Sequence, residues 1–212
     1  MTTCQEMIDD LNDRLNDPTN TQIAEATKIR YLNHGIRGTW PRLYRTMRDA
    51  SLLLLADQFE YLIPPSVGSN SKIIRVEYET HSGSGRYAPV YNFDVVPGLA
   101  DPILQIEHSY LPAEAGARLR ITAAKHLSDF TSPASVYDGP TGTEELPVLY
   151  GMGVALSRRL DDRVDYRRFV SVTNQNGVGT DEIMTASQFS FAQYELLLER
   201  FAMPLPSPDL GG

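Results

Sequence analysis

The stretch Ile74-Arg75-Val76-Glu77-Tyr78-Glu79 has the alternating hydrophobic pattern that replaces the helical one from about residue 58 of this chain. Ile74, Val76 and Tyr78 would share one side of an extended strand, and the charged residues between them would share the other. Further alternating runs lie at residues 91–95, 104–108 and 118–123. Turn signals rich in Pro and Gly separate these runs. The pattern predicts four or five short strands in a small antiparallel sheet, sandwich or partial barrel.

Helical patterns lie on both sides of this alternating region. Apolar side chains at Met7, Ile8, Leu11 and Leu15 recur at helical spacing, and similar stripes follow later in the chain. The pattern predicts four main helices, near residues 3–16, 21–37, 145–161 and 181–202. Asn20 or Thr21 is expected to cap the second of them. Pro41 is expected to open a further short helix that carries Leu43, Tyr44 and Met47.

The order of helices, strands and helices predicts an α+β fold. Because the N-terminal helices alone offer too little apolar surface for a core, we expect them to pack with the C-terminal helices as one bundle. Residues 1–57 and 128–203 are assigned to this helical bundle, and residues 58–127 to an inserted small antiparallel β domain. Residues 204–212 are expected to form an extended tail, because Pro204, Pro206 and Pro208 each lack a backbone donor.

Composition narrows the class of protein. The chain has 212 residues with a formal net charge of −8, whereas a nucleic-acid binder usually carries a basic excess. Its one cysteine, Cys4, excludes an intramolecular disulfide and fits a reducing cytosol. The longest aliphatic run, Leu52 to Leu55, is too short to span a bilayer. The first residues lack the pattern of a signal peptide, so we expect a protein made in the cytosol that binds no membrane.

Side chains that could perform chemistry are scattered. The four histidines His34, His81, His108 and His126 do not pair with one another or with Cys4 at a metal-ligand spacing. His126 and Asp129 could orient one another, but no nucleophile motif is close in the sequence. Gly151-Met152-Gly153 lacks the third glycine of a dinucleotide fingerprint and indicates close helix packing instead. We therefore expect no enzymatic activity, no catalytic residues, no cofactor and no bound metal.

Five arginines form the one basic concentration in this acidic chain: Arg158, Arg159, Arg163, Arg167 and Arg168. They could be a solvated helix end, because Asp161, Asp162 and Asp165 lie between them. Alternatively they could meet an acidic partner surface or nucleic acid that passes close by. We place these arginines at a subunit interface or on the lumen of a ring. The start of the tail, Met203, Pro204, Leu205 and Pro206, is the second candidate interface.

Three stretches resemble the head–tail connector (adaptor) proteins of tailed bacteriophages. The first pairs Tyr31-Leu32-Asn33-His34-Gly35-Ile36 with Trp40-Pro41-Arg42-Leu43-Tyr44, a helix that runs into an aromatic turn containing proline. The second, Phe59 to Pro64, resembles the strand that enters the inserted β region. The third, Glu145 to Gly151 with Ala155 on the next turn, resembles the helix that returns to the bundle. Gly35 and Gly38 depart from the pattern, which has stronger helix formers there.

The resemblance implies a structural virion protein of the neck, assembled in the host cytoplasm. It implies a homo-oligomeric ring of roughly twelve copies between the portal protein and tail-side neck proteins. Genomic DNA would pass through such a ring without sequence-specific binding, and no catalytic residue is carried over. Another neck or tail component, such as a tail terminator or a minor tail protein, is the alternative. A ligand-binding module that uses Tyr78, Tyr87, Tyr91 and Tyr110 is a third reading, and a hydrolase that uses His126 and Asp129 is the last.

Overall fold

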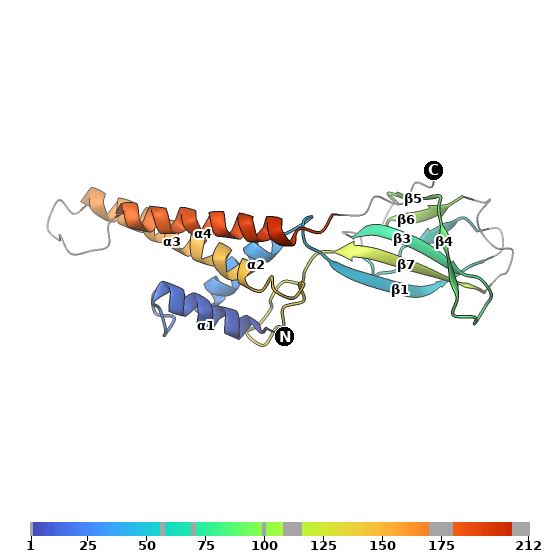
Figure 1. The fold of residues 1–212 in the computed structure, drawn as a ribbon, viewed down its shortest axis with the longest axis horizontal. Helices are drawn as coiled ribbons and strands as arrows, with labels where there is room; N and C mark the ends of the chain where they lie inside the picture. The colour runs from blue at the N-terminus through green and yellow to red at the C-terminus, as the bar shows by residue number, and fades with distance from the viewer. Residues whose placement is uncertain are drawn as a thin grey trace. The chain divides into compact units, whose positions relative to one another are not determined.

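The computed structural model describes residues 2–55, 58–68, 71–98, 101–107, 116–169 and 180–204, without the side chains of 160–169 and 180–182. Contacts divide the chain into two compact units (Figure 1). We call Met1–Leu43 with Leu127–Met203 the helical unit, and Tyr44–His126 with Pro204–Gly212 the β unit. The helices are α1 Cys4–Leu15, α2 Glu25–Gly38, α3 Glu145–Phe169 and α4 Thr180–Phe201. The strands are β1 Arg45–Leu53, β2 Glu60–Leu62, β3 Lys72–Glu79, β4 Tyr87–Val90, β5 Phe93–Val96, β6 Ile103–Ile106 and β7 Arg118–Lys125.

The predicted fold class is confirmed, because the N- and C-terminal helices pack together and an antiparallel β region lies between them in the chain. Two expectations about helix ends are wrong, one about the N-cap of α2 and one about the last residue of α3. α2 begins at Glu25, with Ala24 as an N-cap that makes no side-chain hydrogen bond, so neither Asn20 nor Thr21 caps it. α3 also continues to Phe169, eight residues beyond the predicted end at 161.

α1 supplies one wall of the main helical core. Thr3 and Glu6 form a reciprocal capping box at its start, which satisfies two backbone donors. Its apolar face packs with α2 and α3, and Cys4 is fully buried there. Burial, and then the charge of Glu25, raise the pKa of the Cys4 thiol to about 11. This thiol is therefore protonated and unreactive at neutral pH.

A buried polar network holds α2 to the loop that follows α1. The Lys28 ammonium is fully buried and donates to Asp17 Oδ2 at 2.8 Å, to Asn20 Oδ1 at 2.9 Å and to Asn12 Oδ1. Asp17 also accepts backbone N–H groups from Thr21, Gln22 and Ile23. All three ammonium donors are used, which is the condition under which a buried ion pair is tolerated.

Burial alone would raise the pKa of the Asp17 carboxyl. The hydrogen bond from Lys28, the backbone N–H groups of Gln22 and Ile23, and attraction to the ammonium outweigh burial. The pKa of Asp17 therefore lies well below its ordinary value. The carboxyl stays ionised throughout the neutral range, and the loop before α2 is fixed around it.

Close approach of α2 and α3 depends on Gly35. A Cβ at this position would lie 2.9 Å from the Cβ of Tyr150 and 3.0 Å from the Cα of Pro147. The absence of a stronger helix former at Gly35 thus has a packing reason. Gly153 plays the same part toward α4, because a Cβ there would lie 2.8 Å from the ring of Phe191. The expectation that these glycines serve helix packing agrees with the distances at Gly153, but at Gly151 a Cβ would make only ordinary contacts, the nearest at 3.5 Å.

The β unit contains two antiparallel sheets whose inner side chains share one apolar core. The four-stranded sheet has the order β1-β7-β3-β4 and the three-stranded sheet the order β2-β6-β5. Val76, Ile121 and Leu119 of the first sheet meet Tyr61 and Leu104 of the second. The β unit is therefore a small sandwich of seven described strands, more than the four or five expected.

The short helix expected after Pro41 is wrong. Residues 45–53 form β1, which pairs with β7 from Arg45 opposite Lys125 to Leu53 opposite Arg118. The sequence of β1 has a single β-branched residue, Thr46, so its own propensity does not favour a strand. Long-range pairing with β7 decides its conformation. For this reason the β unit begins at Tyr44, whereas the predicted inserted domain began at residue 58. The strand-like stretch from Phe59 contains β2, the second strand of the unit.

Two acidic side chains of β3 are buried rather than solvated. Glu77 is 5% exposed and Glu79 is 3% exposed. Glu77 accepts from Arg120 Nε at 2.7 Å and lies 3.1 Å from Arg75, and the Arg120 hydrogen bond lowers the pKa of Glu77. Glu79 accepts the backbone N–H of Gly85 at 2.8 Å and of Arg118 at 3.3 Å. Each of the two carboxylates has hydrogen-bond partners, as buried polar groups require. A prediction that places every charged residue of an alternating strand in solvent therefore misses the burial of Glu77 and Glu79.

Candidate assembly surfaces

The predicted arginine cluster lies on the second half of α3. Arg158 and Arg159 are described with their side chains. For Arg163, Arg167 and Arg168 the structure gives the helical backbone only, so the expected position of their guanidinium groups lies outside the described residues.

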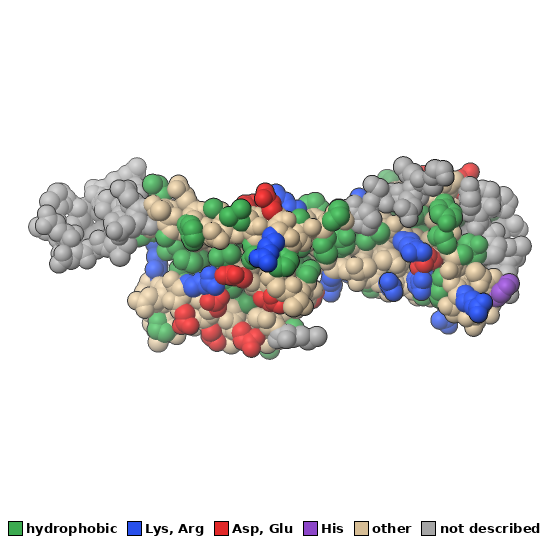
Figure 2. All heavy atoms as spheres, in the orientation of Figure 1, with side chains coloured by type: hydrophobic (Ala, Val, Ile, Leu, Met, Phe, Trp, Pro, Cys, Tyr) green, Lys and Arg blue, Asp and Glu red, His purple; other side chains and the backbone are tan. Residues whose placement is uncertain are grey.

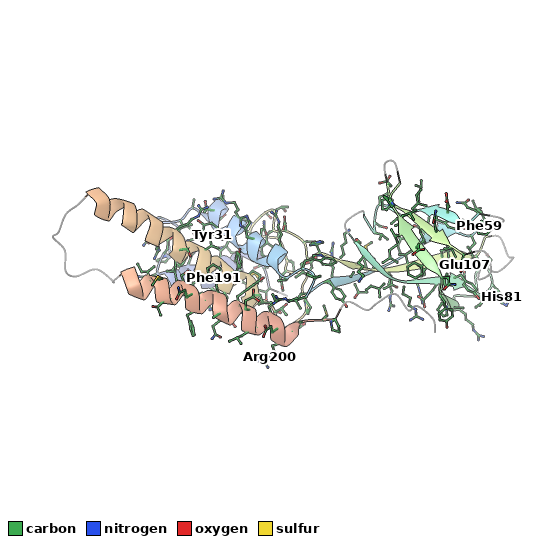
Figure 3. The ribbon with its side chains drawn as sticks, turned by 90° about the horizontal axis from the view of Figure 1, so that it is seen from above. Tyr31, Phe59, His81, Glu107, Phe191 and Arg200 are labelled. Atoms are coloured by element: carbon green, nitrogen blue, oxygen red, sulfur yellow. The ribbon has the colours of Figure 1, made fainter. Side chains whose placement is uncertain are left out.

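Arg158 and Arg159 line a hollow of about 540 Å³ between the start of α2 and the middle of α3. We call it the arginine hollow, and its lining consists of Gln22, Ile23, Ala24, Thr27, Tyr31, Ala155, Arg158 and Arg159. The Arg158 guanidinium lies 5.2 Å from the centre of the Tyr31 ring (labelled in Figure 3). Arg159 donates to the carbonyl of Leu15 at 3.3 Å and to the side chain of Gln22. Arg159 is thus tied to its own unit, whereas Arg158 is exposed.

α4 has one buried face, and large apolar side chains are also exposed on another face. Ile183, Ser187, Ser190, Tyr194 and Leu198 recur at helical spacing and are buried. On another face Phe189 is 63% exposed and Leu196 is 60% exposed. Phe189, Gln193, Leu196 and Arg200 follow one another at intervals of three or four residues, and we call them the α4 stripe. Figure 2 shows hydrophobic side chains at several points along the α3 and α4 face of the helical unit.

The α4 stripe borders a hollow of about 350 Å³ that Arg14, Glu145 and Leu149 complete. Arg14 donates to Asp10 and to Glu145 at 2.9 Å each, so the rim of this hollow is charged and paired.

The many aromatic residues of α4 predict that the helix is buried on several sides, within the subunit or against another copy. Phe191 is covered by Tyr150, with ring centres 5.5 Å apart (Figure 3). Phe189 and Leu196 are left uncovered by the described part of this chain.

The start of the C-terminal tail is partly used inside the chain. The Met203 N–H donates to the Arg42 carbonyl at 2.7 Å, and its side chain packs against the cluster of Leu43, Leu146 and Leu198. Tyr44 donates its hydroxyl to the carbonyl of Pro204, at 3.2 Å. Leu205 and Pro206 lie outside the described residues. The proposed interface role of this segment remains a proposal.

A third hollow, of about 500 Å³, lies on the smaller sheet of the β unit. Its lining includes Phe59, Tyr91, Asn92 and Glu107, and Asn92 donates to Glu107 at 2.6 Å (Phe59 and Glu107 are labelled in Figure 3). The tyrosines considered as a ligand-binding surface do not gather here. Tyr87 lies under the Arg120 guanidinium on the larger sheet, 3.9 Å from it, and Tyr110 is outside the described residues. The tyrosines therefore give no support to a shared binding surface.

Several residues considered for catalysis are exposed or have other partners, and His126 is half-buried. His34 and His81 are exposed, and His108 is outside the described residues. The Arg37 guanidinium donates to both carboxylate oxygens of Asp129. Ser82 donates to the carbonyl of Gly116. Within the described ranges, no three His, Cys, Asp or Glu side chains gather as metal ligands.

Membrane-spanning segments are equally absent from the part of the chain that the structure describes, where no helix combines enough length with enough apolar character to cross a bilayer.

Likeness to known proteins comes from solved structures. No family model matches this chain, and no curated protein matches it. Among solved structures, it is similar to a chain described as "Neck of empty GTA particle computed with C6 symmetry". The two share 16% sequence identity at a TM-score of 0.32, over 97% of this chain and 91% of the other. A TM-score this low does not define a shared fold, so functional conclusions rest on this chain's own residues.

Sequence reasoning found the arginines but missed two parts of these surfaces. Leu196 was not singled out, although its spacing of seven residues from Phe189 places the two on one helix face. Tyr31 was recognised as part of a motif, but its contact with the Arg158 guanidinium was not predicted. That contact joins residues far apart in the chain, and no local pattern reports it.

Proposed function

We propose that this chain is a structural subunit of the neck of a tailed phage or phage-like particle, where copies form a ring between portal and tail. The observation that carries the assembly role is the α4 stripe. Large apolar side chains exposed together on a helix mark a protein contact, because leaving them in water forfeits the free energy of burial. The neck location is supported by the motifs around Tyr31–Ile36, Trp40–Tyr44 and Glu145–Gly151.

Three further features fit a building block better than an enzyme. His34 and His81 are exposed, and Asp129 is ion-paired with Arg37. Two compact units give separate surfaces for different neighbours. The net charge of −8 keeps many copies soluble before assembly and does not favour tight binding to DNA that passes through a ring. In this proposal the portal and tail-side neck proteins are the partners.

Replacing Phe189 and Leu196 together by serine should weaken self-association about 30-fold. Both side chains are already about two-fifths buried, so each loses about 1 kcal/mol of contact burial, and the two together lose about 2 kcal/mol. Sedimentation velocity over a range of protein concentrations measures the change.

Leu62→Ser is the matched control for this variant. Leu62 is 65% exposed on β2, in the other unit, and its replacement should leave association unchanged. Equal association of wild type, the double variant and the control would exclude the α4 stripe as an assembly contact. Circular dichroism shows whether each variant is still folded.

A further inference from the structure

The arginine hollow has the chemistry of a site for carboxylate groups. Arg158 is exposed beside Tyr31, and no ion pair of Arg158 occurs among the described residues. Arg159 adds a second positive charge at the same wall, and no carboxylate is among the lining residues that the structure describes. The start of α2 forms another wall, where Ala24 offers no side-chain cap to the first backbone N–H groups. Its helix dipole adds to the positive potential there.

The exposed face of α1 carries the complementary charge. Asp9 and Asp13 lie four residues apart and are both exposed, while Met7, Ile8 and Leu11 on the other face are buried. Figure 2 shows acidic side chains gathered over α1, below α3 and α4. Asp9 accepts from Gln5 at 2.8 Å, and neither aspartate pairs with an arginine or lysine in the described part of the chain. Both carboxylates are available to a cation on another molecule.

We propose that the arginine hollow of one copy receives the Asp9 and Asp13 face of α1 from the adjacent copy. This inference rests on the proposed function and names a contact that builds the ring. The two surfaces use different residues of the same unit, so the contact is heterologous. Contacts of this kind repeat head to tail and close into a ring or continue as a filament.

The two arginines could also bind a nucleic acid, but the charges around the hollow disfavour it. Binding to phosphates strengthens with the number of unpaired cations. Among its described residues the hollow has two arginines, of which Arg159 is already engaged. The acidic face of α1 belongs to the same unit, and the chain as a whole carries a charge of −8. A protein surface with two carboxylates matches this hollow better than a polyanion does.

Charge reversal tests the contact from both sides. Arg158→Glu places a carboxylate at the exposed wall of the hollow and cancels the charge of Arg159 there, and Asp9→Arg with Asp13→Arg reverses the α1 face. Each reversed side alone should weaken self-association at low salt by at least tenfold, because like charges then meet. All three changes in one chain should restore association to within a few-fold of wild type. Association of the wild type should also weaken as sodium chloride rises from about 50 to about 500 mM.

The control is Arg30→Glu, because Arg30 is an exposed arginine of α2 that does not line the hollow. It changes the net charge as Arg158→Glu does, and it should leave association unchanged. Thermal unfolding followed by circular dichroism checks that every variant is folded. Sedimentation velocity measures association throughout.

The possible outcomes distinguish failure of this contact from failure of the proposed function. Restored association in the combined variant supports the contact. If the wild type assembles and the reversed variants assemble equally well, the contact is excluded while the proposed function stands. If reversal weakens assembly and the combined variant does not recover, the hollow serves another anion, and loss of DNA binding in Arg158→Glu would identify nucleic acid. A wild type that never self-associates, either alone or on portal-bearing heads, overturns both the contact and the proposed function.

Discussion

Replacing Lys28 by methionine should lower the free energy of unfolding by about 3–5 kcal/mol. The change keeps a long side chain in the space between α1 and α2 but removes the ammonium that three side-chain oxygens share. Asp17 would remain buried with its negative charge, helped only by backbone N–H groups. Chemical denaturation of the purified protein measures the loss.

The matched control is Arg37→Ala, which breaks the ion pair between Arg37 and Asp129. Both of these side chains are substantially exposed, so the loss should be at most about 1 kcal/mol. A loss of similar size in Lys28→Met would contradict the structural role given to the buried network.

The effect of Lys28→Met should also depend on pH in a defined direction. Because the folded pKa of Asp17 is depressed, its contribution to stability is full above the unfolded value of about 3.9. It is lost as the pH falls through that value toward the folded pKa. The unfolded value is common to both proteins, so the difference in stability between wild type and Lys28→Met should narrow in acid from the pH at which the Asp17 carboxyl of the variant becomes protonated. A difference that widens in acid would show that Asp17 does not carry the buried charge.

Gly35→Ala should destabilise the protein by about 2 kcal/mol, although alanine is the better helix former by about 1 kcal/mol. The added methyl would lie 2.9 Å from the Cβ of Tyr150 and 3.0 Å from the Cα of Pro147. Neither atom belongs to a flexible side-chain end, so α3 itself would have to move. The thermal midpoint of unfolding, measured by calorimetry, reports the loss.

Gly151→Ala is the matched test in the partner helix. Its added methyl would meet side-chain atoms of Leu11 and Leu32 at 3.5–3.6 Å, which is ordinary contact. Helix propensity should then dominate and stabilise the protein by up to about 1 kcal/mol. The two glycine variants should thus shift stability in opposite directions, and a shift of the same sign would contradict the helix packing described here.

Periodicity was enough to predict long helices toward both ends of the chain and strands between them. The four long helices and the strands around β3, β6 and β7 each carry a strong apolar pattern, so their existence follows from the sequence. β1 could not be found in this way, because Arg45–Leu53 has neither strict alternation nor strong β propensity, and pairing with β7 fixes it. The burial of charged side chains was not predicted, for a related reason. Lys28, Glu77 and Glu79 look solvated until the partners that neutralise or hydrogen-bond them are brought together by the fold.

The candidate assembly surfaces were predictable only in part. A cluster of arginines is visible in the sequence, and Arg158 and Arg159 do lie together at one hollow. Which apolar residues of α4 lack cover depends on where α3 lies, and the sequence alone cannot give that. The aromatic excess of α4 indicated burial on several sides, and the uncovered Phe189 and Leu196 leave one of those sides for another molecule.

Electron microscopy of the purified protein, alone and mixed with portal-bearing heads, tests the central claim most directly. Class averages should show closed rings of a single copy number, and labelled protein should lie at the neck of the heads. A protein that stays monomeric at every concentration and leaves the necks of portal-bearing heads unoccupied would contradict the proposal that this chain builds a neck ring.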